Sequence, residues 1–66
     1  MTGRELLRFR LQRQWTQHRL AVRLGISQAT VCRFEDGADD LTPLTRAKIA
    51  AAVARIRESE RRERAS

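Results

Sequence analysis

The chain has 66 residues, enough for one domain at most and for a core of marginal size. A single Cys excludes an intramolecular disulfide, and together with a single His it cannot complete a zinc site, so we expect no metal and no other cofactor. The formal net charge of +6 indicates a polyanionic partner. No apolar run approaches the ~20 residues that cross a membrane, and the N-terminus lacks a signal-peptide core.

The charge is distributed unevenly along the chain. Residues 1–34 carry seven Arg and one Glu, residues 35–45 carry four acids and no base, and residues 46–66 carry seven bases and three acids. Thirteen of the 14 bases are Arg, whose guanidinium binds phosphates and guanine edges bidentately. A compositional bias towards Arg and Ala would give the same count without any binding role, so the charge alone does not decide between the two interpretations.

Residues 2–13 are predicted to form the first helix. Leu6 and Phe9 lie three residues apart on one face and are expected to enter the core. Leu7 and Leu11 form a second apolar pair on a different face. Together the two pairs form an apolar surface wider than one neighbouring helix can cover, so we expect the C-terminal helix to cover the second pair.

Local capping chemistry marks the helix ends. Hydroxyl side chains that can cap a free backbone N–H precede each predicted helix, at Thr2, Thr16, Ser27 and Thr42. Gly25 follows the last apolar residue of the second helix, which is typical of the left-handed residue that ends a helix. Asp36-Gly37 provides a similar stop for the third helix.

The segment 16–37 organises the chain. Its apolar positions are Leu20, Ala21, Leu24, Ile26, Val31 and Phe34. Their spacing predicts two short helices, each with one buried face, that meet at a steep angle around Gly25. The outer face of the second helix is left with Gln28, Ala29, Cys32 and Arg33.

An Ala-rich stretch without a helix breaker follows Pro43 and predicts one long helix over about residues 43–62. It carries two apolar seams. One seam consists of Leu44, Ala47, Ala51 and Ala54; the other consists of Ile49, Val53 and Ile56. Intramolecular packing needs only one seam, so we expect the seam of Ile49, Val53 and Ile56 to form a dimer interface. The charged tail is expected to fray.

The segment 16–37 resembles the helix-turn-helix of the lambdoid phage repressor and Cro family, also called XRE-like. The matching residues are Gln17, Ala21, Gly25, Val31 and the ending Phe34-Glu35-Asp36-Gly37. The resemblance extends back through Arg10 and Trp15 and covers roughly residues 4–40. It implies an all-α fold, a small bundle of four to five helices that forms a single DNA-binding domain over residues 1–66.

The resemblance also implies a set of structural residues: Arg10, Glu35, Ala21, Gly25 and Val31. In the family an Arg at this position pairs with the Glu near the end of the recognition helix, which here would join Arg10 to Glu35. Gln14 stands where the family often has glycine, and this departure predicts a less tightly turned helix end. Trp15 is expected to pack against the start of the second helix.

The helix that begins at Gln28 is predicted to lie in the major groove of duplex DNA. The Gln28 amide can bind adenine N6 and N7, and Arg33 can bind guanine O6 and N7 or a phosphate. Ala29 and the Thr30 methyl group can contact thymine methyls, and Cys32 completes this base-reading set as a small filler beside the DNA. A redox sensor is the alternative role for the Cys32 thiol. Gln17 matches the family's phosphate contact. The further phosphate candidates are Thr16, Arg10, Arg13, Arg46 and Lys48.

A monomer of this size reads too few base pairs to be selective in a genome. The family's solution is a homodimer on an inverted-repeat operator with half-sites ~34 Å apart. We therefore expect a repressor of its own phage, mobile-element or bacterial operon, cytoplasmic and associated with the nucleoid, with no membrane or small-molecule partner. The build is similar to phage Cro proteins, restriction–modification controllers and anti-CRISPR-associated regulators, and the residues do not separate these three.

Two other classes of function compete with this interpretation. A protein-binding module, such as an antitoxin, would use the Ala-rich helix or the charged tail, but the groove-reading residues Gln28 and Arg33 argue against it. An enzyme would need a nucleophile–base pair or clustered carboxylates in a pocket. His18, Cys32 and the acids lie in too small a stretch to build such a pocket, so we expect no catalysis.

Overall fold

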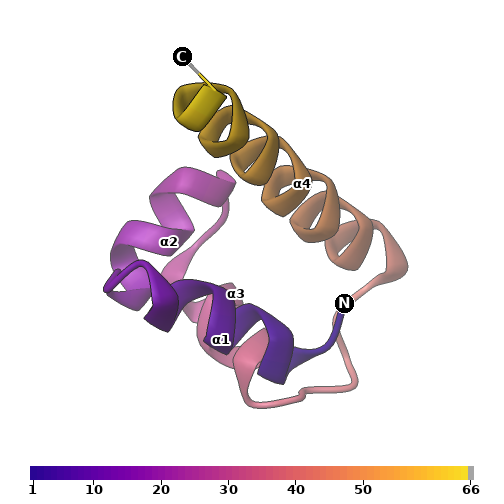
Figure 1. Ribbon diagram of the computed structural model, residues 1–66. Helices are drawn as coiled ribbons and strands as arrows, with labels where there is room; N and C mark the ends of the chain where they lie inside the picture. Colours follow the sequence, from indigo (N-terminus) through magenta and orange to yellow (C-terminus); the bar gives the residue numbers. More distant parts are fainter. Residues whose placement is uncertain (66) are drawn as a thin grey trace.

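The computed structural model describes residues 1–65, which form four α-helices and no strand. The helices are α1 (Gly3–Gln12), α2 (Gln17–Leu24), α3 (Gln28–Glu35) and α4 (Pro43–Ala65). Figure 1 shows α1, α2 and α3 grouped on one side of the long helix α4, whose C-terminal end extends beyond them. The predicted all-α fold is confirmed.

Each helix begins at a residue whose hydroxyl accepts a backbone N–H. At α1 the cap is reciprocal, because Thr2 Oγ1 accepts from the Glu5 N–H at 3.1 Å while Glu5 Oε1 accepts from the Thr2 N–H at 2.9 Å. The hydroxyls of Thr16, Ser27 and Thr42 each accept from the N–H three residues later, at 3.0 to 3.1 Å. These local bonds explain why the helix starts were predictable from the sequence.

Three residues adopt the left-handed backbone conformation at the ends of helices or in the turns after them. Gly25 has φ 72° and Gly37 has φ 80°, at little cost because glycine has no Cβ. Gln14 has φ 58° as well, so the turn after α1 is as tight as a glycine would make it. The expectation of a looser end at Gln14 was therefore wrong, and this side chain is held in a conformation that costs ~1 kcal/mol.

The start of α1 lies against the end of α3. A Cβ added at Gly3 would be 2.2 Å from the Phe34 carbonyl oxygen and 2.9 Å from that of Glu35. Glycine is required here by close backbone approach, not by its φ angle. This contact fixes the first turn of α1 over the C-terminal carbonyls of α3.

One continuous core joins the four helices. α1 contributes Leu6 and Phe9, and α4 contributes Ile49, Ala52, Val53 and Ile56. α2 and α3 contribute the other predicted apolar positions except Ile26, which lies in the turn between them and packs against the core while partly buried. Because Ile49, Val53 and Ile56 are buried within the same chain, they are not available to a second subunit. The predicted dimer interface was therefore wrong: the larger Ile and Val side chains bury more apolar area against the body than the Ala seam does.

Two further expectations about the long helix need correction. α4 does not cover the second apolar face of α1, since Leu11 remains 57% exposed and Leu7 is only partly buried. α4 also continues past residue 62 to Ala65. Its charged end is supported by pairs of Glu58 with Arg61 and Arg62 at helical spacing.

Candidate nucleic-acid interface

The outer face of α3 is open to solvent at its start and near its end. Gln28, Ala29 and Arg33 are exposed, and no hydrogen bond to another described residue occupies the Gln28 amide. Thr30 is half-buried and its hydroxyl lies 2.8 Å from that of Ser27. The Gln28 amide is therefore free to bind a base edge, whereas the Thr30 hydroxyl already has a partner in Ser27.

Arg33 is already partnered within the chain. Its Nη2 forms an ion pair with Oδ2 of Asp40, a residue of the loop between α3 and α4, and both side chains are more than half exposed. Next to it, the thiol of Cys32 donates to Oδ2 of Asp36 at 3.6 Å. The sequence did not predict the Asp40 contact, because nothing in the spacing of the loop residues shows that the loop folds back over α3.

The N-terminus of α2 offers a second, separate site for an anion. Thr16 is exposed and caps the helix. The backbone N–H groups of Gln17 and His18 lie in the first turn of α2, so the carbonyls four residues before them are outside the helix and accept no hydrogen bond from them. Free N–H groups at a helix start, together with the helix dipole, favour a phosphate.

Beneath these two sites a polar network joins three helices. Arg10 of α1 donates to Glu35 of α3 through Nε at 2.8 Å and Nη2 at 3.0 Å, and its Nη1 donates to the Trp15 carbonyl at 3.1 Å. The Gln17 side-chain amide donates to the same carboxylate at 3.1 Å. Hydrogen bonding to Glu35 raises the pKa of Arg10.

Arg10 is therefore a structural residue and not a phosphate ligand. Its side chain is 14% exposed and that of Glu35 is 4% exposed, and each guanidinium nitrogen already donates to a partner. The phosphate role predicted for Arg10 was wrong, because a count of charges does not show which way an arginine points. The amide of Gln17 is likewise directed at Glu35, which leaves its backbone N–H as the group that can meet a phosphate.

Arg13 is also committed to the fold. Its Nε and Nη2 donate to Glu60 at 2.8 and 2.6 Å, its Nη1 donates to the Phe9 carbonyl at 2.7 Å, and its guanidinium stacks 3.6 Å from the centre of the Phe9 ring. This pair joins α1 to α4, and hydrogen bonding to Arg13 lowers the pKa of Glu60. The predicted phosphate role of Arg13 was wrong for the same reason as that of Arg10.

The two basic candidates on α4 differ from each other. Arg46 is half-buried, donates through Nη2 to the Ala38 carbonyl at 3.0 Å and lies 5.6 Å from the centre of the Phe34 ring. It therefore fixes the loop that follows α3. Lys48 is exposed.

Two arginines that the sequence analysis did not single out lie beside Trp15. The guanidinium groups of Arg23 and Arg19 lie 4.9 and 5.9 Å from the Trp15 ring, which packs edge-on against Phe9 with ring centres 6.1 Å apart. Trp15 thus packs in the body of the protein, as expected, and also supports cations on α2. The i, i+4 spacing of the two arginines was the signal that could have revealed them.

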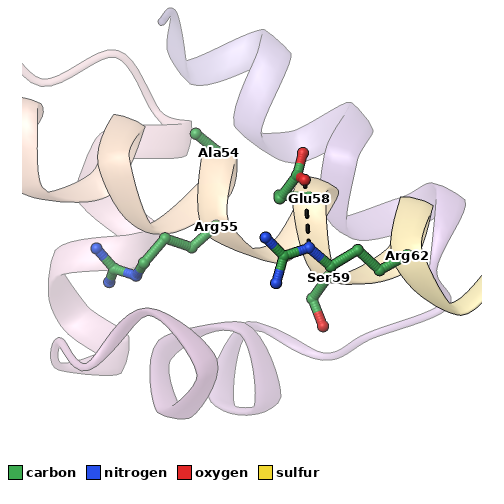
Figure 2. A pocket seen from close by; sticks show the side chains of 5 residues that line it. All are labelled: Ala54, Arg55, Glu58, Ser59 and Arg62. Carbon is green, nitrogen blue, oxygen red and sulfur yellow. Dashed lines mark ion pairs between the residues drawn. The ribbon is translucent and has the colours of Figure 1, made fainter.

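The remaining surface features do not form an enclosed site. A hollow on α4 is lined by Ala54, Arg55, Glu58, Ser59 and Arg62, all from one helix, and Figure 2 shows Glu58 paired with Arg62 across it. Within residues 1–65, no cluster of three or more His, Cys, Asp and Glu side chains is suited to hold a metal ion. In the same part of the chain, no helix is both long and apolar enough to cross a membrane.

Comparison with known proteins agrees with this geometry. A family model described as helix-turn-helix matches residues 6–59, which is most of the chain. No curated protein and no solved structure matches this chain. The chain therefore belongs to the XRE-like helix-turn-helix family of the phage repressor and Cro type, a family of DNA-binding regulators.

Proposed function

We propose that the protein is a homodimeric repressor that binds an inverted-repeat operator in duplex DNA and controls its own phage, mobile-element or bacterial operon. The observation that carries this proposal is the outer face of α3, where Gln28, Ala29 and Arg33 are exposed in a helix supported from behind by the core. A helix held in this way enters the major groove with its first residues at the base edges.

Each outer residue of α3 has a distinct role in the proposed complex. The free amide of Gln28 reads adenine through N6 and N7, and Arg33 reads guanine through O6 and N7. Ala29 and the methyl group of Thr30 contact thymine methyls. Cys32, half-buried and bonded to Asp36, fills the space beside them without reading a base.

Phosphates are held by groups on α2 and α4 that flank the recognition helix. The backbone N–H groups at the start of α2, at Gln17 and His18, bind one phosphate, with the hydroxyl of Thr16 beside them. Lys48 and the guanidinium atoms of Arg46 that the loop leaves free are further contacts. Such contacts fix the register of the protein on the duplex but do not specify sequence.

The second subunit is proposed to bind the face of α4 that the core leaves uncovered. Leu44 is 79% exposed, and Ala47 and Ala51 follow it at helical spacing and are exposed as well. An exposed Leu next to small side chains lets two helices approach closely. Leu44 also lies in the first turn of α4, directly after the loop that ends the recognition helix.

The dimer can be tested with a pair of matched variants. Leu44→Glu is expected to give monomers in analytical ultracentrifugation, because a carboxylate would be desolvated between the two helices. Leu11→Glu changes an equally apolar, exposed residue on α1 and is expected to remain dimeric. A dimeric Leu44→Glu protein would show that the subunits meet elsewhere.

The proposed function itself is tested by selecting random duplexes with the purified protein at two salt concentrations. An inverted repeat with a fixed spacing is the expected result, and it would allow the operator to be located in a genome. Salt-sensitive binding without any motif would contradict specific repression, because phosphate contacts alone bind all sequences.

The exposed apolar residues also favour a second candidate, a protein-binding module of the antitoxin type. Leu44 and the Ala-rich face of α4 would then bind a different protein instead of a second copy of this chain. The same selection separates the two functions, since a protein-binding module has no need to prefer any base sequence.

A further inference from the structure

The acidic residues that follow the recognition helix serve different ends. Glu35 lies inside the network with Arg10, and Asp36 ends α3 and accepts the thiol of Cys32. Asp40 forms an ion pair with Arg33. Asp39 is exposed and has no ion-pair partner among residues 1–65.

The contact between Asp40 and Arg33 is set up by the fold of the loop. Gly37 has φ 80°, which turns the chain back after α3, and the Ala38 N–H donates to the Arg33 carbonyl at 3.0 Å. Arg46 of α4 then holds the Ala38 carbonyl at 3.0 Å. Two bonds and a glycine turn thus direct the loop over the end of α3, where Asp40 reaches Arg33.

The geometry of the pair leaves Arg33 able to bind a base. Oδ2 of Asp40 forms an ion pair with Nη2, and no described residue accepts a hydrogen bond from Nε or Nη1. Guanine offers two acceptors, O6 and N7, to a guanidinium in the major groove. A carboxylate held beside the cation also offsets its attraction for phosphates, which occur at every position of a duplex.

We propose that Asp40 is a specificity-determining positioning residue, which holds the Arg33 guanidinium for a guanine edge and reduces its binding to phosphates. This inference rests on the proposed function, because it assigns a partner to Arg33 within the same DNA interface. It explains why a carboxylate lies beside Arg33 in a chain whose net charge favours DNA. The role of Asp40 is to raise the ratio of specific to non-specific binding.

The test compares Asp40→Ala with Asp39→Ala. Both variants remove one negative charge from neighbouring loop positions, so both should raise affinity for an unrelated duplex by a similar small factor, about twofold. Only Asp40→Ala should lower the preference for guanine at the position read by Arg33, by about fivefold, because only Asp40 contacts the guanidinium. That position is identified as the one whose preference is lost in Arg33→Ala.

A double variant shows whether Asp40 acts through Arg33. Asp40→Ala should have no further effect on base preference once Arg33→Ala is present, and Asp40→Glu should restore part of the preference. Equal preference profiles for Asp39→Ala and Asp40→Ala, measured on the duplex that the unmodified protein selects, would overturn the proposal and leave the proposed function intact. Failure of the unmodified protein to select any motif would overturn both.

Discussion

Two arginine–carboxylate pairs at the end of α3 differ in exposure, and the difference separates structure from function. In the pair of Arg10 and Glu35 the side chains are 14% and 4% exposed, whereas in the pair of Arg33 and Asp40 they are 52% and 64% exposed. The first pair is largely withdrawn from water, so the loss of either partner would leave a poorly solvated charge. The exposed pair gains little from its own contact and can exchange with a ligand.

The largest expected effect tests the buried pair. Glu35→Ala should lower the free energy of unfolding by about 3 kcal/mol, because it leaves the Arg10 guanidinium buried without a counter-charge and frees the Gln17 amide. Urea denaturation followed by circular dichroism measures the change. Asp40→Ala is the matched control and should change it by less than ~0.5 kcal/mol. Equal losses in the two variants would show that burial does not distinguish these pairs.

The next effect concerns binding by the exposed pair. Arg33→Ala should weaken binding to the selected duplex by about 1–3 kcal/mol, since it removes a guanine contact. Its free energy of unfolding should stay within ~0.5 kcal/mol of that of the unmodified protein. Fluorescence anisotropy on labelled duplexes measures the affinity. If Arg33→Ala lowered the stability but kept the affinity, Arg33 would be a structural residue and not a base-reading one.

A third pair, Arg13 with Glu60, has intermediate exposure and should show an intermediate, pH-dependent effect. In the folded state, hydrogen bonding to Arg13 lowers the pKa of Glu60 below its ordinary value of 4.5. The stabilisation that the ionised Glu60 gives to the fold is therefore complete above the ordinary pKa, and it is lost as the pH falls through the lower pKa of the folded state.

Glu60→Gln should accordingly be less stable than the unmodified protein at pH 7, and the difference between the two should shrink towards pH 3. Thermal unfolding at the two pH values measures this. A constant difference in Tm at both pH values would mean that the Glu60 charge does not contribute through Arg13.

Local chemistry explains which features of the fold were predictable. The hydroxyl caps at Thr2, Thr16 and Ser27 and the glycine at Gly25 act on their own few residues, so the sequence contains all the information that fixes those helix ends. The apolar spacing of the helix-turn-helix likewise gave its buried face.

Features that depend on distant parts of the chain were not predictable in this way. Arg13 finds its partner at Glu60, 47 residues away in sequence, and a charge count assigned it to phosphate instead. The two seams of α4 are both apolar, and periodicity alone does not say which one meets the body. Side-chain volume distinguishes them, because the larger side chains of Ile49 and Val53 are the buried ones. The contact of Asp40 with Arg33 depends on the path of a loop.

The most direct test of the account is to compare Gln28→Ala with Gln17→Ala on a panel of duplexes that carries each single-base change of the selected operator. Gln28→Ala should lose preference at one base position, because its free amide is the group that we propose to bind a base edge. Gln17→Ala should weaken binding to all duplexes alike and by a smaller amount, because it keeps the backbone N–H proposed to bind a phosphate and removes only the amide that joins the start of α2 to Glu35. The same profile in both variants would contradict the claim that the outer face of α3 reads the sequence.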